Sequence, residues 1–182
     1  MSTEEEIENL KFPIGEFEIP EQVSVENIRD YIDEVARLPQ SLIEEVEHLD
    51  QDQLQMVYRP EGWNIRQLVH HIADSHMSAF MRFKWALTED EPTIKAFNEK
   101  GFAELADSKF TPVTLSLGFL KALHAKWIIL LENMSTEDFE RTFIHPESGF
   151  RYSLKQSLAN YAWHGRHHLE HIIELKKRKG WD

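Results

Sequence analysis

The chain has 182 residues, of which 41% are hydrophobic and 29% charged, as expected of one soluble globular domain with a substantial core. Its formal net charge of −12 argues against a nucleic-acid partner, because an acidic surface repels phosphates. We expect no membrane span, since there is no run of about 18 apolar residues. A cytoplasmic location fits the absence of cysteine and of a signal-like start.

The chain should begin with an irregular segment, residues 1–23, in which prolines and a glycine interrupt any regular pattern. A first helix is predicted over about 24–49, because apolar residues recur there at helical spacing after Ser24. Pro39 should kink or divide this helix, since proline lacks the amide hydrogen that a helix interior needs.

Three further helices follow in the pattern. The second should begin after Asn64, which with Gln67 forms an approximate capping box. The third is predicted over about 113–133 from its leucine-rich apolar spacing. The fourth should begin after Ser153, which opens a better capping box, and should stop at Gly180.

Residues 89–112 form a long connection between the second and third helices, within which Asn98 to Asp107 could form a short helix. Antiparallel neighbours need only a short turn, so a connection of this length indicates a crossover and parallel helices. The fold prediction is therefore a single all-α domain, residues 1–182, built as a four-helix bundle with one long crossover.

Histidines concentrate in the fourth helix. The chain has ten of them, and four lie between positions 164 and 171. His164 and His168 stand four residues apart, so they stack on one helix face and can reach one metal ion. His167 and His171 share that spacing but lie further from the apolar stripe. A site in a bundle core needs ligands beside the stripe, which favours the first pair.

A third ligand would have to come from another helix, and the second helix offers three histidines. His76 falls in the middle of the apolar stripe, as expected of a core histidine bonded to a neighbour. His71 lies at the stripe's edge, from which its ring could reach a facing helix, and His70 should point into solvent. The helical pattern alone favours His71 only modestly over His76.

Two stretches of the chain resemble one known family closely. They are the run from Tyr58 to Met77, which contains His-His-Ile-Ala-Asp-Ser-His-Met, and the run from Tyr161 to Ile172. Shorter matches near Pro13, Phe143 and Gly180 extend the likeness over nearly the whole chain. The chain is thereby identified as similar to the DinB-like superfamily and, within it, to the YfiT-type metal-dependent hydrolases, which have a four-helix bundle fold.

The resemblance implies one divalent metal ion per chain, zinc first and nickel second, held by His71, His164 and His168. It also implies a homodimer. Three neutral ligands leave an open coordination position, at which water could be activated for hydrolysis of a small-molecule substrate. Relatives that transfer low-molecular-weight thiols suggest an alternative, in which a substrate thiolate takes that position. A metal-bearing module without turnover is the third reading, and a fourth ligand from His167 or His171 would make the metal structural.

Other side chains near the histidines are weaker candidates. Asp74 and Glu170 are possible general bases, although both positions also suit carboxylates that orient a ligating histidine or face solvent. Two arginines, Arg66 and Arg166, could bind an anionic group, and surface ion pairing explains them as well. Aromatic walls for a pocket could come from Trp63, Tyr161 and Trp163.

Overall fold

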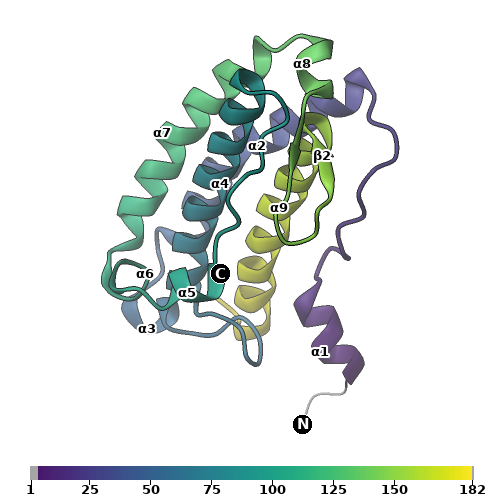
Figure 1. The fold of residues 1–182 in the computed structure, drawn as a ribbon. Coiled ribbons are helices and arrows are strands. Elements are labelled where there is room, and N and C mark those ends of the chain that lie inside the picture. Colours follow the sequence, from purple (N-terminus) through teal and green to yellow (C-terminus); the bar gives the residue numbers. More distant parts are fainter. Residues whose placement is uncertain (1–3, 182) are drawn as a thin grey trace.

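Four long helices form the body of the molecule (Figure 1), in a computed structural model that describes residues 4–181. They are α2 (Val25–Val46), α4 (Ile65–Thr88), α7 (Val113–Glu132) and α9 (Leu154–Lys179). Helix α2 packs against α7 and α9, and α4 packs against the same two helices from the other side. The all-α four-helix bundle predicted from the sequence is thereby confirmed.

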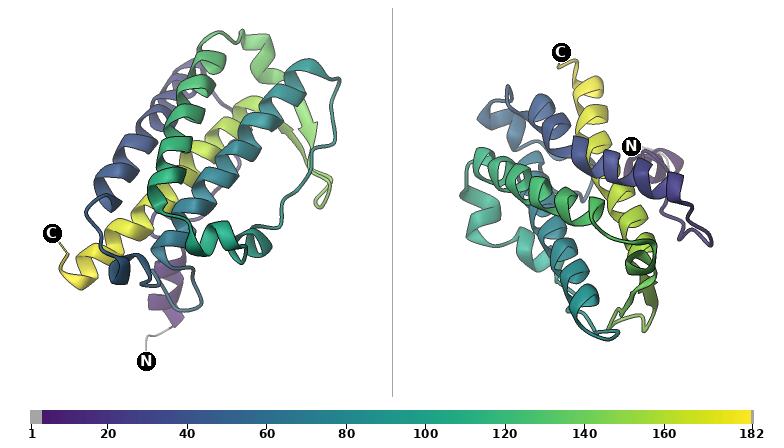
Figure 2. Two further views of the ribbon diagram at one scale, coloured as in Figure 1. Left: turned by 90° about the vertical axis from the view of Figure 1, so that its left-hand side faces the viewer. Right: turned by 90° about the horizontal axis from the view of Figure 1, so that it is seen from above.

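The connection between α4 and α7 crosses the length of the bundle. Both helices run in the same direction, because the chain returns from the end of α4 along the outside of the bundle before α7 begins (Figures 1 and 2). This confirms the predicted crossover. Its helical content differs from the prediction, since two short helices form in place of one. They are α5 (Glu99–Ala103), whose first turn Asn98 caps, and α6 (Ala106–Phe110).

Smaller elements complete the fold. Helix α3 (Gln51–Leu54) precedes α4, and α8 (Thr136–Glu140) follows α7. Strands β1 (Thr142–Ile144) and β2 (Arg151–Ser153) form an antiparallel hairpin in which Phe143 pairs with Tyr152. The hairpin leads directly into α9, and the sequence pattern did not indicate it.

The prediction of an irregular start was wrong in part. Residues Glu4–Lys11 form helix α1, while residues 1–3 lie outside the described residues. Lys11 in the last turn of α1 complements the helix dipole. From Phe12 to Ser24 the chain has no helix or strand, as expected.

The helix ends follow the capping chemistry. Ser24, Asn64 and Ser153 each accept a hydrogen bond from the backbone amide three residues further on, so α2, α4 and α9 start where predicted. Gly180, at φ 65°, ends α9 in the left-handed conformation. Pro39 lies inside α2 without dividing it, so the prediction that it could split the helix in two was wrong.

Apolar side chains form two separate clusters along the bundle. One gathers around Trp127 and Phe83 near the hairpin end. The other gathers around Leu42, Leu68 and Ile72 near the opposite end. Between the two clusters α9 contributes His164, His167 and His168, and α4 contributes Ser75 and His76, with His71 one turn earlier. A polar layer therefore crosses the middle of the bundle. This layer contains the candidate site.

Helix α7 is more apolar than its packing requires. By length and mean hydropathy it is the helix, among the described residues, that could cross a membrane, and core helices of soluble bundles meet the same test. Leu117, Leu120 and Trp127 face the interior. On the outer face, Leu115, Phe119 and Ile129 are exposed by 64%, 44% and 64%.

Candidate metal centre

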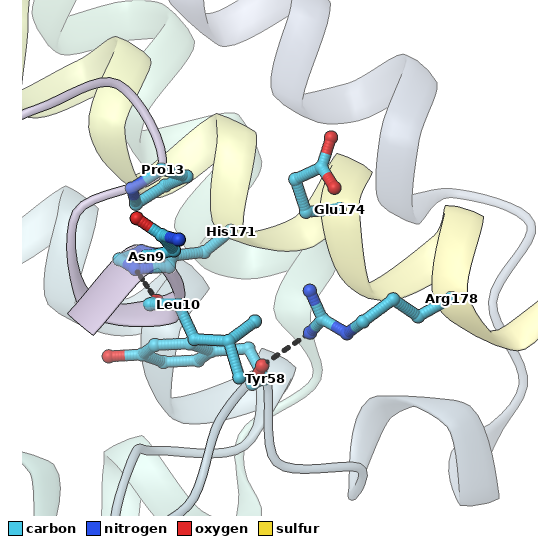
Figure 3. Close-up of a pocket in the computed structure, with 7 residues that line it drawn as sticks. All are labelled: Asn9, Leu10, Pro13, Tyr58, His171, Glu174 and Arg178. Carbon is cyan, nitrogen blue, oxygen red and sulfur yellow. Dashed lines mark hydrogen bonds between the residues drawn. The ribbon is translucent and has the colours of Figure 1, made fainter. Parts of the chain in front are cut away.

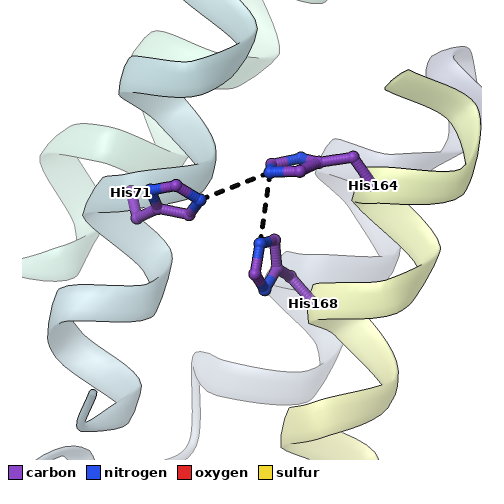
Figure 4. Close-up of side chains that lie close together, drawn as sticks. All are labelled: His71, His164 and His168. Carbon is purple, nitrogen blue, oxygen red and sulfur yellow. Dashed lines mark hydrogen bonds between the residues drawn. The ribbon is translucent and has the colours of Figure 1, made fainter. Parts of the chain in front are cut away.

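Three histidine side chains meet in the polar layer of the bundle (Figure 4). His71 projects from α4, and His164 and His168 project from α9. The Nε2 atom of His164 lies 3.3 Å from Nε2 of His71 and 3.2 Å from Nε2 of His168. The three nitrogens lie within 4.8 Å of one another. We call these residues the three-histidine cluster; the structure brings together the residues that the sequence singled out.

The spacing of these nitrogens suits one metal ion. Two imidazole nitrogens bound at ~2.0–2.1 Å to a tetrahedral ion are about 3.3 Å apart, because the tetrahedral angle fixes that separation. The two measured separations, 3.3 and 3.2 Å, fall at that value. Imidazole donors without any thiolate suit zinc, nickel and similar ions better than calcium or magnesium.

Burial keeps the cluster uncharged, which is the form that binds a metal. Loss of hydration lowers the pKa of His71 to about 4, with a smaller contribution from His167. The same cause, followed by the neighbouring histidines, holds the pKa values of His164 and His168 well below their usual range. At neutral pH the three rings are therefore neutral.

Two cavities open onto the cluster. His71 and His168 line a cavity of about 680 Å³, together with Arg59, Trp63 and other residues. His164 lines a second cavity, beside Ser75 and Tyr161. Glu99 and Lys100 of α5 belong to the walls of both, so the crossover connection forms part of the enclosure. A small molecule can thus reach the nitrogens from solvent.

Arg82 brings a positive charge to the second cavity. Its side chain is only 9% exposed, and its Nη1 donates to the hydroxyl oxygen of Tyr161 at 3.1 Å. The Nε atom of Arg82 has no hydrogen-bond partner, and none of the ion pairs among the described residues includes this arginine. A buried cation without a carboxylate partner is costly, and it favours an anionic group in the adjoining cavity.

Behind His164 two more histidines extend the polar layer. The Nε2 of His76 lies 3.4 Å from Nδ1 of His164, and its Nδ1 lies 3.0 Å from Nε2 of His124. His76 is fully buried and His124 is 2% exposed. Burial lowers the pKa of His124 to about 4 and holds the pKa of His76 well below its usual range. His76 is therefore a core histidine bonded to a neighbour, as predicted, whereas the role of His124 had no signal in the sequence pattern.

Comparison with known proteins places the chain in a family. The family model described as DinB superfamily matches residues 34–172. The chain belongs to this superfamily. Relatives from Bacillus cereus strain 03BB102 and Bacillus thuringiensis subsp. konkukian, both named "Putative metal-dependent hydrolase", are 47% identical over 173 residues, covering 95% of this chain and 99% of each relative.

A solved structure extends the likeness to three dimensions. YfiT from Bacillus subtilis, described as a probable metal-dependent hydrolase with an unusual four-helix bundle topology, superposes with a TM-score of 0.93. It is 41% identical in sequence, and the match covers 96% of this chain and 99% of that one. The fold of this chain is thus shared with a protein of known structure.

One expectation about the other histidines of this DinB-superfamily chain, that His70 should point into solvent, was wrong. His70 is buried, with Nδ1 2.7 Å from Oγ of Ser116 and Nε2 3.1 Å from the carbonyl oxygen of Thr111. His167 and His171 are also buried, because the N-terminal segment covers them. The Nε2 of His171 donates to the carbonyl oxygen of Leu10 at 3.1 Å. Segments outside the four long helices therefore cover His70 on α4 and His171 on α9.

The structure also places the remaining candidates. Asp74 and Glu170 are absent from the linings of both cavities at the cluster. Burial, and then Asp107, raise the pKa of Asp74 to about 6, and Glu170 lies 3.6 Å from the ammonium group of Lys177. Neither carboxylate forms a hydrogen bond to the three rings within the described part of the chain.

The arginine and aromatic candidates differ in whether they line the cavities at the cluster. Arg66 donates to the carbonyl oxygen of Thr111, and Arg166 pairs with Glu34 at 3.0 Å, so ion pairing explains only the second. Trp63 packs its ring 4.5 Å from that of His71, and Tyr161 lies 5.8 Å from His164, measured between ring centroids. Both line the cavities, whereas Trp163 stacks on His167.

A further cavity lies at the other side of His171 (Figure 3). Its lining consists of Asn9, Leu10, Pro13, Tyr58, His171, Glu174 and Arg178. No member of the three-histidine cluster takes part, and Arg178 is engaged with the carbonyl oxygen of Tyr58 at 2.6 Å. We therefore place the chemistry at the two cavities that open onto the cluster.

Proposed function

We propose that this protein is a metal-dependent hydrolase in which His71, His164 and His168 hold one divalent ion, zinc first and nickel second. The observation that carries the proposal is the convergence of three neutral Nε2 atoms beside two solvent-accessible cavities. When bound, such an ion supplies Lewis acidity and lowers the pKa of a coordinated water to about 7. Three neutral ligands leave its full charge in place for that purpose.

The protein's own residues have separate roles in this proposal. The three histidines of the cluster would hold the ion beside the two cavities. Arg82, which lines the second cavity without a carboxylate partner, brings a positive charge near the negative charge that develops on a carbonyl or related oxygen during hydrolysis. Tyr161 receives a hydrogen bond from Arg82, so its ring stays fixed as one wall beside His164.

The decisive assay uses zinc-loaded protein and generic ester and amide substrates without any thiol. We expect turnover that His164→Ala abolishes, because the site loses a ligand. Thiol transfer is the competing activity, since a metal with neutral ligands stabilises a thiolate and the chain has no cysteine of its own. No hydrolysis, together with a thiolate-to-cobalt charge-transfer band when thiol is added to cobalt-loaded protein, would replace hydrolysis by thiol transfer. Absence of both activities would leave a metal-binding module.

We also propose that the protein is a homodimer that buries the outer face of α7. The exposed apolar side chains of this face are Leu115, Phe119 and Ile129. Exposed apolar side chains gathered on one face of a helix are favourably covered by a second apolar surface. A twofold dimer would supply that surface from the same helix of a second copy.

A further inference from the structure

Pro39 leaves one backbone carbonyl of α2 without its helical partner. In an α-helix each carbonyl oxygen accepts from the amide four residues later. The residue four positions after Val35 is Pro39, which has no amide hydrogen. The Val35 side of the helix is buried, so its carbonyl oxygen needs another donor.

His124 of α7 provides that donor. Its Nδ1 lies 2.6 Å from the carbonyl oxygen of Val35. A carbonyl can only accept, so the proton must reside on Nδ1 of His124. A neutral imidazole has one donor and one acceptor nitrogen. The Nε2 of His124 is therefore the acceptor, and it faces Nδ1 of His76 at 3.0 Å.

The same reasoning carries through the next ring. His76 donates from Nδ1 to His124, which leaves its Nε2 as an acceptor. That atom lies 3.4 Å from Nδ1 of His164. His164 then holds its proton on Nδ1, and its Nε2 presents a lone pair toward Nε2 of His71 and His168.

We propose that a hydrogen-bonded relay, from the Val35 carbonyl through His124 and His76, fixes the tautomer of His164. The relay exists because Pro39 cannot donate to that carbonyl. It keeps the Nε2 atom of His164 unprotonated, which is the form that binds a metal. His124 and His76 are positioning residues in this scheme, since neither touches the cluster's open side. The proposal rests on the metal site of the proposed function and adds how the chain prepares one of its ligands.

The relay takes the place that a carboxylate has in many metal sites. A ligating histidine usually donates its second N–H to a carboxylate or carbonyl, which fixes its tautomer. Here the carbonyl is two rings away, and all intermediate partners are uncharged. Because His76 is fully buried and His124 is 2% exposed, solvent does not offer a competing partner to either ring.

The first test observes the tautomers directly in the metal-free, full-length protein. Proton–nitrogen correlation spectra of histidine-labelled protein should show the proton on Nδ1 in His124, His76 and His164. A spectrum with the proton on Nε2 of His164 or of His76 would overturn the proposal. This measurement uses the wild-type chain, so it does not depend on any variant folding.

The second test compares two replacements of His124. His124→Gln keeps a donor for the Val35 carbonyl and an acceptor for His76, whereas His124→Leu removes both. Cobalt affinity, measured by competition with a chelator, should fall roughly 10-fold or more in His124→Leu, as for loss of an outer partner. It should stay within about threefold of wild type in His124→Gln. Equal affinities in the two variants would contradict the relay.

Replacing the proline separates positioning from stability. Pro39→Ala restores an amide hydrogen that competes with His124 for the Val35 carbonyl. The variant should be more resistant to urea, because alanine is favoured in a helix interior, and yet bind cobalt more weakly. Affinity that is unchanged or stronger in Pro39→Ala would count against the role of the proline. Failure of wild-type protein to bind cobalt would instead refute the proposed function. The tautomer spectra of the metal-free protein would still show whether the hydrogen bonds of the relay exist.

Discussion

Gly165 of α9 lies so close to Leu38 of α2 that a Cβ added to the glycine would stand 2.6 Å from Cδ2 of the leucine. Leu38 is only 4% exposed, so its side chain has little room to withdraw. The absence of a side chain at Gly165 thus allows α2 and α9 to approach each other directly beside His164. The helix that carries two cluster residues is positioned by this contact.

Gly165→Val should destabilise the protein by about 1–3 kcal/mol, because an added side chain overpacks a closely packed core. It should also weaken metal binding, since α9 must shift at His164. Gly118→Val is the matched control, because nothing lies within 4 Å of the corresponding Cβ on α7. Urea unfolding checks the stabilities. Equal destabilisation by the two substitutions would mean that the contact with Leu38 does not constrain the helices.

Removing any cluster residue should remove the metal. In His168→Ala the affinity should fall by more than the roughly 10–100-fold that loss of an outer partner costs. Elemental analysis after metal loading and desalting measures the occupancy. His48→Ala serves as control, because the side chain of His48 is 86% exposed. Unchanged metal content in His168→Ala would refute the assignment of this ligand.

Arg82→Gln should reduce kcat/KM for ester hydrolysis by about 100-fold, the scale of losing one donor to a developing oxyanion. Metal content should be retained, because Arg82 is not a cluster residue. The exposed Arg29 offers the comparison, and Arg29→Gln should leave the rate unchanged. Steady-state kinetics on metal-loaded protein decide the matter, and wild-type kcat/KM in Arg82→Gln would exclude a role in charge stabilisation.

The metal-free protein should lose stability as the pH falls from about 6.5 to 4. Burial lowers the folded-state pKa of both His71 and His124 to about 4, so the unfolded chain binds these protons first. Each such histidine costs about 2 kcal/mol at pH 5 compared with pH 8. Asp74, with its pKa raised to about 6, acts in the opposite direction but is a single group.

Urea midpoints of the metal-free protein at pH 8, 6 and 5 measure this dependence. His124→Gln should show a shallower decline than wild type, since one of the buried titrating rings is gone. A flat profile between pH 8 and 5 would show that the buried histidines do not control the stability.

A dimer through α7 should dissociate when charge enters the apolar face. Phe119→Asp and Ile129→Asp should sediment as monomers at tens of micromolar, while wild type sediments as a dimer. Lys121→Asp on the same helix serves as a charge control, because Lys121 is exposed but lies about 120° around the helix from that face. Monomeric wild-type protein at that concentration would rule out the proposed dimer.

Local patterns were sufficient for the helices and for one half of the cluster. The capping residues Asn64 and Ser153 fix helix starts through bonds within four residues, and the spacing of His164 and His168 follows from helix geometry alone. His71 needed more, because its helical position distinguished it only modestly from His76. Only the family resemblance separated the two.

The sequence pattern could not predict which side chains are covered by segments distant in the sequence. His70 seemed solvent-facing because the helical wheel of α4 shows only which residues oppose its apolar stripe. The wheel contains no information about the crossover connection, whose Thr111 carbonyl lies against His70. The burial of His171 had no signal in the pattern for the same reason, since Leu10 of the N-terminal segment lies against it. The partners of Pro39 and His124 likewise depend on the packing of α2 against α7.

The histidines and part of the cavity walls come from different segments of the chain, which has a consequence for engineering. The cluster is carried by α4 and α9, whereas Glu99 and Lys100 in the walls of both cavities belong to α5. Randomised libraries confined to the segment around α5 would therefore diversify what the cavities accept without touching a metal-facing nitrogen. The connection offers directed evolution a replaceable cover over an unchanged reaction centre.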